Sequence, residues 1–318
     1  MIRILLLSAG TNACYHVAKT LKTAYEKDFF IIGADINEAC LIPTIGFLDA
    51  FYKVSYSSAP SYYEEVLGIC KKEKVDVILP SFDADQKMFY PENPDLLNMG
   101  VLSLGTSEKT LPFYADKLKM YNFLEMKKLP LPKIYTLADI CDTQEYFIKP
   151  KNGVASQGTA KIVGYKLKLL DNIENFLIQE FCSEPEYTLE CFCFGGKLYS
   201  VARERIAAKA GVCVKARVFD DKELHAIAER FVSSVAVPYY FNLQFMKNTL
   251  GDPVITDVNL RLAGGMSLSA AAGWDEVSAI ADILLKKSED EIVSHLNINR
   301  TEKFVVRAYT DIVTKELS

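Results

Sequence analysis

Two short segments decide the fold: Phe-Asn-Leu-Gln-Phe (241–245) and Ile-Thr-Asp-Val-Asn-Leu-Arg (255–261), with a turn-forming Gly-Asp-Pro between them. Both alternate apolar and polar residues, which is typical of strands with one buried face, so we expect a β-hairpin. In the second strand, a period of two places Asp257, Asn259 and Arg261 on one face. A solvated strand face with an ordinary surface pair of charges is the alternative interpretation.

Gln244 belongs to the first strand of this hairpin and can face the same side as Asp257 and Asn259. The three side chains offer a carboxylate and two amide oxygens, which suit Mg²⁺ because this ion takes its remaining ligands from water and substrate phosphate. Arg261 adds a guanidinium whose forked donors match a phosphoryl group. The hairpin therefore favours a site for metal-bound phosphate.

A second segment, Phe-Ile-Lys-Pro-Lys (147–151), leads into a loop of small residues that contains Gly153, Ser156 and Gly158. Lys149 lies on the incoming strand, and the backbone N–H groups of such a loop can bind phosphate. The loop runs between two strands and lacks the GK[ST] ending, so it is not a Walker A loop. A plain hairpin turn is the alternative, because turns favour glycine for conformational reasons.

A third segment, Leu-Ile-Gln-Glu-Phe-Cys (177–182), is a strand that contains Glu180 and is followed four residues later by Glu186. Free backbone groups at the end of a strand can bind the edge of adenine, and a following acid can bind ribose hydroxyls. The alternative is an ordinary hydrophobic strand with acids in its connection.

The first hundred residues alternate predicted strands (2–7, 29–34 and 75–79) with predicted helices (13–25 and 62–72). The first strand is a continuous aliphatic run, as in strands that are buried on both faces. This alternation favours a parallel, doubly wound sheet with right-handed crossovers.

A nicotinamide site in this region is disfavoured. Asp35 ends the second strand, where an acid could bind ribose, but the turn over 8–13 lacks the G-x-G-x-x-G pattern. We therefore expect a Rossmann-like shape without dinucleotide binding. Asp83 and Asp85 follow the third strand, where open α/β sheets bind ligands, and they can hold an amino group or simply cap a turn.

The pattern changes after about residue 105. A helix is expected over 116–129, and the following region is rich in hairpins, with a tight turn at Gly195 and Gly196. The predicted strands are 146–150, 159–163, 176–181, 187–194, 197–203, 241–247, 254–260 and 303–309, and two further helices are predicted over 221–234 and 274–287. This part of the chain is of the α+β type.

The sequence resembles the ATP-grasp superfamily, most closely a synthetase half of the carbamoyl-phosphate synthase large chain. The resemblance rests on three features in this order and at these intervals. They are the strand with Lys149 and its loop, the hinge with Glu180 and Glu186, and the Gln…Asp-x-Asn-x-Arg pattern over 244–261. The resemblance implies a Rossmann-like domain over 1–105 and an ATP-grasp domain over 106–318. It divides the latter into a small lid subdomain over about 106–183 and a large subdomain over about 184–318.

The same resemblance implies roles for individual residues. Two of them, Lys149 and Arg261, would act on the transferred phosphoryl group, and Gly211 to Cys213 would form a further nucleotide-contacting loop. The implied ligands of two Mg²⁺ ions are Gln244, Asp257 and Asn259. The implied ATP-binding residues are Lys117, Lys149, Ser156, Glu180, Phe181, Cys182, Glu186, Gln244 and Asp257.

The family's shared chemistry implies an ATP- and Mg²⁺-dependent ligase that activates a carboxylate as an acylphosphate for attack by an amine or similar nucleophile. Its partners would be small-molecule carboxylates and amines. In the sequence, Arg203, Arg205 and Lys215 can hold a carboxylate, or they can simply be solvated charges on a hairpin. One alternative is a carbamoyl-phosphate-synthase-like subunit that phosphorylates bicarbonate or carbamate. Another is an inactive nucleotide-binding protein, because Asp257 stands where the family usually has Glu.

The composition narrows the class of protein further. The 318 residues are 50% hydrophobic and 24% charged, an ordinary globular composition, and the net charge of −5 argues against a generally basic nucleic-acid surface. Eight cysteines without a CxxC pair indicate buried thiols in a reducing compartment. Because no apolar run approaches the roughly 20 residues of a membrane span, we expect a cytoplasmic protein without membrane or nucleic-acid partners, and a homo-oligomer is compatible with the sequence.

Overall fold

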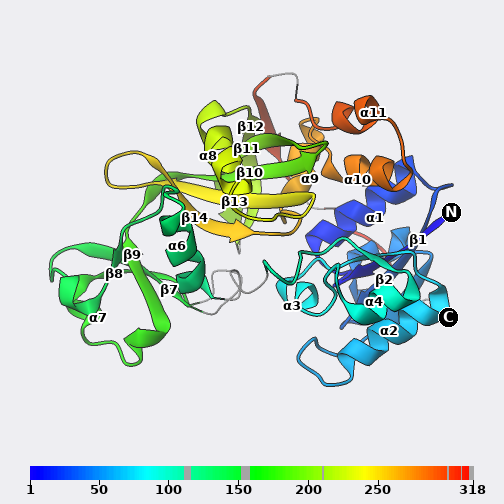
Figure 1. Ribbon diagram of the computed structural model, residues 1–318, viewed down its shortest axis with the longest axis horizontal. Helices are drawn as coiled ribbons and strands as arrows, with labels where there is room; N and C mark the ends of the chain where they lie inside the picture. The colour runs from blue at the N-terminus through cyan, green and yellow to red at the C-terminus, as the bar shows by residue number, and fades with distance from the viewer. Residues whose placement is uncertain (111–115, 152–157, 210, 299–300, 309, 315–318) are drawn as a thin grey trace.

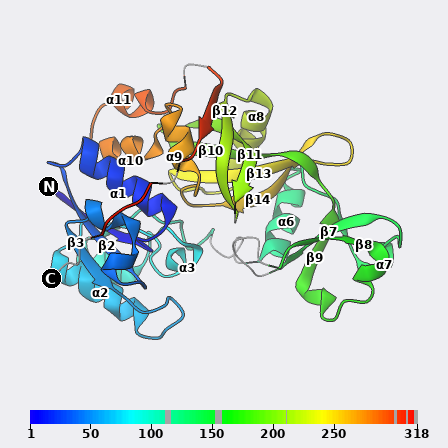
Figure 2. The same cartoon turned by 180° about the vertical axis from the view of Figure 1, so that it is seen from behind.

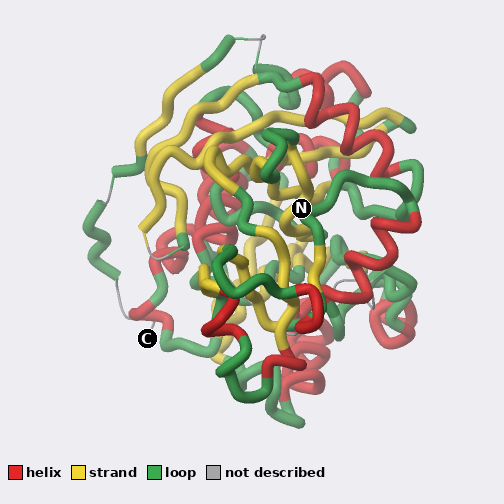
Figure 3. Tube along the Cα trace, turned by 90° about the vertical axis from the view of Figure 1, so that its left-hand side faces the viewer, coloured by secondary structure: helices red, strands yellow, loops and turns green. Residues whose placement is uncertain are grey.

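A computed structural model describes residues 1–318 except 111–115, 152–157, 210, 299–300, 309 and 315–318. Three β-sheets follow one another along the long axis of the molecule (Figure 1). A parallel sheet lies at one end, a small antiparallel sheet at the other, and a larger antiparallel sheet between them. The reverse view shows the same order (Figure 2), and Figure 3 views the molecule end-on, with helices on the right and strands along the upper left.

The N-terminal sheet is parallel throughout, in the order β3-β2-β1-β4-β5. Its central strand is buried on both faces, because Ile4 and Leu6 join one hydrophobic core while Leu5 and Leu7 join another. The strands are β1 (Ile2–Leu7), β2 (Phe29–Asp35), β3 (Ala50–Lys53), β4 (Val77–Leu79) and β5 (Leu102–Ser103). The helices are α1 (Asn12–Ala24), α2 (Tyr62–Glu73), α3 (Asp83–Gln86) and α4 (Pro94–Met99), with 3-10 turns η1 (Ala39–Leu41) and η2 (Pro43–Phe47). The predicted parallel α/β sheet is confirmed.

The small sheet is antiparallel, in the order β6-β9-β7-β8. The helix before it begins at an N-cap, Asp116, whose carboxylate accepts the N–H groups of Leu118 and Lys119 at 2.9 and 3.1 Å. The strands are β6 (Ile134–Tyr135), β7 (Glu145–Pro150), β8 (Ala160–Val163) and β9 (Phe176–Glu180). The helices are α6 (Lys117–Met126) and α7 (Gly164–Leu167), with 3-10 turns η3 (Leu137–Asp139) and η4 (Ile173–Asn175).

The central sheet has the order β14-β13-β10-β11-β12-β15. Its strands are β10 (Ser183–Phe194), β11 (Lys197–Lys209), β12 (Val212–Phe219), β13 (Tyr240–Lys247), β14 (Pro253–Asn259) and β15 (Lys303–Val306). The turn between β10 and β11 uses Gly195 and Gly196 with φ of 59° and 73°, the left-handed region that glycine adopts easily. Strand β12 was not predicted, because its charged residues obscure the apolar alternation.

Helices cover both faces of the central sheet. On one face, Leu224 and Phe231 of α8 (Lys222–Val232) pack with Phe241 of β13. On the other, α9 (Met266–Ala271) and α10 (Glu276–Leu284) lie between the sheet and α1, and α11 (Glu289–Ser294) follows. None of the described helices is long and apolar enough to cross a membrane.

One hydrophobic core joins the N-terminal sheet to the rest of the chain. Val17 of α1 and Leu6 of β1 belong to the same cluster as Val277 and Ile280 of α10. A hydrogen bond from the Tyr240 hydroxyl to the Leu104 carbonyl, 2.6 Å long, also joins the two parts. The domain limits at residues 105 and 183 stay predictions, and this core includes residues from both sides of the first limit.

Candidate functional site

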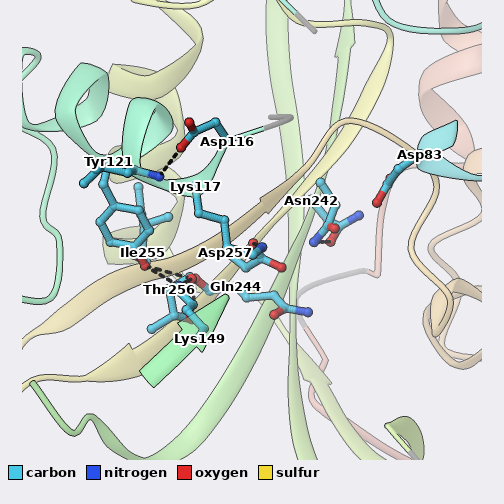
Figure 4. Close-up of polar contacts among 12 residues, drawn as sticks. Asp83, Asp116, Lys117, Tyr121, Lys149, Asn242, Gln244, Ile255, Thr256 and Asp257 are labelled. Carbon is cyan, nitrogen blue, oxygen red and sulfur yellow. Dashed lines mark hydrogen bonds and ion pairs between the residues drawn. The ribbon is translucent and has the colours of Figure 1, made fainter. Parts of the chain in front are cut away.

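A cavity of about 710 Å³ lies where the three sheets meet. Its wall includes most of the side chains that the sequence predicted for the site, and Figure 4 shows several of them converging. The predicted residues that line it are Lys117, Lys149, Phe181, Cys182, Glu186, Gln244, Asp257, Asn259 and Arg261. Glu180 is not among the lining residues, and Ser156 lies outside the described residues.

The floor of the cavity is one face of the central sheet, and this face changes character along its strands. At one end Phe192 and Tyr240 are apolar and pack into the core shared with α1. At the other end, Thr188 and Gln244 lie on the same face, since they are even numbers of residues along the same strands. The polar end is thus left to line the cavity.

A β-bulge at Thr256 sets the direction of the predicted metal ligands. Gln244 pairs with Asp257 whereas Phe245 pairs with Ile255, so Thr256 has no partner across the ladder. As a result, Ile255 turns into the core, although strict alternation would place it on the same face as Asp257. Asp257 and Asn259 face the cavity, as expected.

The bulge also exposes the Thr256 carbonyl to Lys149, a cavity cation that is 5% exposed. Lys149 donates from Nζ to this carbonyl and to the Tyr121 hydroxyl, both at 2.8 Å. Tyr121 in turn donates to the same carbonyl at 2.9 Å. Burial lowers the pKa of Lys149 to about 8, and the negative charge of Asp257 opposes this shift.

Tyr121 supports Lys149 from behind the cavity wall, and sequence reasoning missed it. It lies on α6, one turn after Lys117, in a segment that resembles any amphipathic helix. Burial holds its pKa well above the ordinary value, so the phenol remains a neutral hydrogen-bonding group. Its ring also lies under the Lys149 ammonium, with 4.6 Å between Nζ and the ring centroid.

Asp257 faces a second cation, since Lys117 Nζ lies 3.2 Å from its Oδ1. On the other side, Asn259 Oδ1 accepts from Arg261 Nη2 at 3.4 Å and its amide donates to Asn242 at 3.2 Å. Among the described residues, no three His, Cys, Asp or Glu side chains gather as a metal site. A cation here would rest on one carboxylate, two amide oxygens and substrate phosphate, a donor set that suits one Mg²⁺.

The predicted hinge lies at the opposite end of the cavity from the N-terminal sheet. Phe181 and Cys182 line the wall, and burial raises the pKa of the Cys182 thiol to about 12, which excludes a reactive thiolate. Glu186 also lines it and pairs with Arg205 at 3.1 Å.

The Glu180 carboxylate is directed away from the cavity. It accepts hydrogen bonds from the Lys133 N–H at 2.8 Å and from the Thr249 hydroxyl at 3.0 Å. These bonds join the small sheet to the turn between β13 and β14. The Glu180 N–H also donates to the Lys133 carbonyl, at 2.9 Å, so the predicted nucleotide contact would fall to the Glu180 carbonyl.

The N-terminal sheet closes the other end of the cavity. Asp83 follows β4 and pairs with Arg261, with 2.9 Å between Oδ1 and Nε. Asp85 is instead buried and accepts the hydroxyls of Ser8 and Tyr62 at 2.8 and 2.6 Å, so it is not free for a ligand. Of the cations considered for a carboxylate, Arg203 and Arg205 line the cavity, while Lys215 does not and is exposed.

Two family models match the chain. Residues 172–310 match a model described as "ATP-grasp in the biosynthetic pathway with Ter operon". Residues 4–104 match a model described as "PylC-like, N-terminal domain". A sequence search of curated proteins found no match.

Solved structures share the fold at low identity. N5-carboxyaminoimidazole synthetase from Staphylococcus aureus, complexed with ADP, is 13% identical with a TM-score of 0.71, over 90% of this chain and 78% of that one. L-amino acid ligase from Bacillus licheniformis is 12% identical with a TM-score of 0.72, over 93% and 77%. A biotin carboxylase domain from Hydrogenobacter thermophilus, with MgADP, ADP and bicarbonate, is 10% identical with a TM-score of 0.68, over 87% and 68%.

These matches agree with the three sheets of the chain and with the predicted ATP-grasp residues that line the cavity. The chain resembles ATP-grasp proteins in sequence over its C-terminal part and in fold over nearly its whole length. It has the ATP-grasp fold, preceded by a parallel α/β domain whose sequence matches the PylC-like N-terminal model.

Proposed function

We propose that the protein is an ATP- and Mg²⁺-dependent ligase that activates a small carboxylic acid as an acylphosphate and joins it to an amine. The observation that carries the proposal is that three cations, Lys117, Lys149 and Arg261, line one cavity, with Lys117 paired to Asp257. Such an arrangement suits a triphosphate, since phosphoryl transfer depends on positioning and charge neutralisation. The ADP complexes of proteins with this fold support the same assignment.

The reaction has two steps. First, a carboxylate oxygen attacks the γ-phosphorus of ATP, the bond to the β–γ bridging oxygen breaks, and ADP leaves. Then the amine nitrogen attacks the carbonyl carbon of the acylphosphate, inorganic phosphate leaves with the bonding electrons, and the nitrogen loses a proton. Neither step needs a covalent enzyme nucleophile, which agrees with the raised pKa of Cys182 in the wall.

Lys149 and Arg261 would act at the two ends of the transferred group. Lys149 is fixed by Tyr121 and the Thr256 carbonyl, so its ammonium is already in place before a phosphate arrives. Arg261 lies at the end of the cavity formed by the N-terminal sheet, where the acceptor acid would enter. Because both cations are held by protein acceptors, little reorganisation is needed during transfer.

The nucleotide would lie between the hinge and the central sheet. Phe181 and Cys182 would contact the base and Glu186 the ribose, while Lys117 would reach the phosphates. Ser156 is proposed to contact phosphate from the loop that follows β7.

Asp257, Gln244 and Asn259 would hold Mg²⁺ together with phosphate oxygens. When bound, the ion would neutralise charge on the nucleotide phosphates. The Lys117 ammonium that now pairs with Asp257 would then turn to the phosphates. A second ion, which the sequence resemblance implies, would depend mainly on phosphate oxygens, because the described cavity offers few further carboxylates.

Bicarbonate is the second candidate for the acid. A biotin carboxylase domain of similar fold holds MgADP and bicarbonate, and phosphorylated bicarbonate would be the product of a carbamoyl-phosphate-synthase-like subunit.

A substrate panel scored by ADP and phosphate release tests the proposal. Small carboxylic acids are offered with amines, and bicarbonate with ammonia, each with ATP and Mg²⁺. We expect release that requires both an acid and an amine. Release with bicarbonate and ammonia alone would establish the second candidate. Mg²⁺-dependent ATP binding without release from any pair would leave an inactive nucleotide-binding protein. Calorimetry that shows no ATP binding would overturn all three candidates.

A further inference from the structure

Arg203 is a cation in the cavity wall that the proposed phosphoryl transfer does not use. It lies on β11, is 2% exposed, and donates from Nε to Glu190 Oε1 at 2.9 Å. Glu190 is fully buried on β10. Burying such a pair is costly, and the terminal nitrogens of an arginine held through Nε are left free as a fork.

That fork is directed to the cavity. Within the described part of the chain, the Arg203 side chain makes no hydrogen bond besides the one to Glu190, and its terminal nitrogens are not sealed from solvent. Gly265 makes room for it, because a Cβ there would lie 2.5 Å from Cζ and Nη1 of the guanidinium. The guanidinium is thus packed on one side, paired at its base and open at its tip.

The fork is separate from Asp257, the carboxylate of the proposed metal site. In the central sheet, Arg203 pairs with Thr188, Thr188 with Gln244, and Gln244 with Asp257, so these four share one row across the strands. Three strand spacings separate the ends of the row, about 14 Å between the Cα atoms of Arg203 and Asp257. The Arg203 side chain turns toward Glu190 on β10, still two strands from β14. A single carboxylate group cannot contact both places.

We propose that Arg203 binds a second, unreacting carboxylate of the acceptor acid. The acid would therefore be a small dicarboxylate or an acidic amino acid, with one carboxylate phosphorylated near Asp257 and the other held by the Arg203 fork. Bidentate pairing of guanidinium with carboxylate explains why arginine, fixed in direction by Glu190, stands at this position. This inference rests on the proposed function for the identity of the reacting group.

The test uses matched pairs of acids in which an amide replaces one carboxylate: succinate with succinamate, glutarate with glutaramate, L-aspartate with L-asparagine and L-glutamate with L-glutamine. Binding is measured by calorimetry without nucleotide, so the result does not depend on turnover. We expect the parent protein to bind at least one diacid about tenfold or more tightly than its amide, the range for hydrogen bonds to charged groups. Equal binding of every pair, or no binding of any diacid, would overturn the proposal.

Two variants locate the effect. Gly265→Ala places a methyl group against the guanidinium and should abolish the preference for the diacid. Gly264→Ala is the matched control, because a Cβ there meets no atom within 4 Å, and it should bind the diacid as the parent does. A preference that survives Gly265→Ala would show that Arg203 is not the subsite.

A variant that removes Arg203 must also remove Glu190, because a buried Glu190 carboxylate without its partner would destabilise the fold. The double variant Arg203→Met with Glu190→Met should lose the diacid preference and keep the parent's affinity for ATP with Mg²⁺. Weakened ATP binding with an unchanged preference would assign the fork to nucleotide phosphate and overturn the proposal. A diacid preference lost in these variants, in a protein that shows no acid-dependent ADP release, would support the subsite while refuting the ligase.

Discussion

Arg261 Nε donates to Asp83 Oδ1 across 2.9 Å, although the two residues are 178 positions apart in the chain. This pair joins the end of β14 to the segment that follows β4 of the parallel sheet. Open α/β sheets bind ligands beyond the carboxyl ends of their strands, and here that edge faces β14, the strand that carries the proposed metal ligands Asp257 and Asn259. The N-terminal sheet thus contributes to the site directly.

Asp83→Asn tests whether this pair positions Arg261 or merely stabilises the fold. Arg261 and Asp83 side chains are 26% and 44% exposed, so the loss in the free energy of unfolding should stay below about 1 kcal/mol. Turnover should fall by about tenfold, because the guanidinium loses the contact that holds it over the acceptor. Chemical denaturation and steady-state kinetics measure the two effects.

The control for this variant is Glu38→Gln, which breaks the exposed pair of Glu38 with Lys53 on the N-terminal sheet. Neither residue lines the cavity, so turnover should not change. If Asp83→Asn alters turnover no more than Glu38→Gln does, Arg261 needs no positioning by Asp83.

The lowered pKa of Lys149 predicts a pH dependence of nucleotide affinity. With a pKa of about 8, the ammonium loses its proton as the pH rises through 8, and the attraction to phosphate is lost with it. ADP affinity should fall by about tenfold between pH 7.5 and 9. Calorimetry across this range is the measurement. Lys149→Arg, which stays charged throughout, should give a flat profile, and a flat profile in the parent would contradict the prediction.

The lowered pKa of Lys149 affects the free energy of unfolding in the opposite direction to nucleotide affinity. The ordinary lysine pKa of 10.5 applies to the unfolded chain, so between pH 8 and 10.5 the unfolded state binds more protons at Lys149 than the folded state does. The contribution of Lys149 to stability therefore rises over this interval. A fall in affinity above pH 8 cannot then be attributed to unfolding caused by Lys149.

Tyr121→Phe removes the hydroxyl that both accepts from Lys149 and donates to the Thr256 carbonyl. Two buried groups lose a partner, so we expect the free energy of unfolding to drop by about 1–3 kcal/mol. ADP affinity should fall as well, because the ammonium is less firmly placed. Tyr165→Phe, at a 51% exposed position, is the matched control and should change neither quantity. Parent-like ADP affinity in Tyr121→Phe would show that Lys149 does not need this hydroxyl.

The sequence predicted the sheets well and the cavity in part. Strand β1 has the predicted bounds, Ile2–Leu7, because a short, continuous aliphatic run is typical of a strand that is buried on both faces. Strand β3 was missed, since Ala50–Lys53 is a partly exposed edge with little alternation. The prediction of a shared face for Gln244 and Asp257 agrees with their pairing across the hairpin.

What sequence reasoning could not supply is the set of contacts between distant segments. The bulge at Thr256 breaks the period of two, and only the cross-strand register reveals it. Tyr121 has no motif, and its role depends on Lys149 and Thr256 lying beside it. Glu180 fits the hinge pattern by position, yet its carboxylate is held by Lys133 and Thr249, which the pattern does not include.

Asp257 offers the sharpest test of the proposed metal site, because it is the carboxylate among the predicted ligands. Asp257→Asn keeps the size of the side chain and removes its charge. ADP binding should change little, since the hinge and Lys149 are intact, whereas Mg²⁺-dependent turnover should fall by about 100-fold or more. Asp257→Glu restores the carboxylate with a longer reach and should retain Mg²⁺-dependent turnover. Titration of ADP with and without Mg²⁺, beside kinetics, separates the effects. Parent-level turnover in Asp257→Asn would exclude Asp257 as a metal ligand, whereas equal loss in Asp257→Asn and Asp257→Glu would mean that geometry matters more than charge.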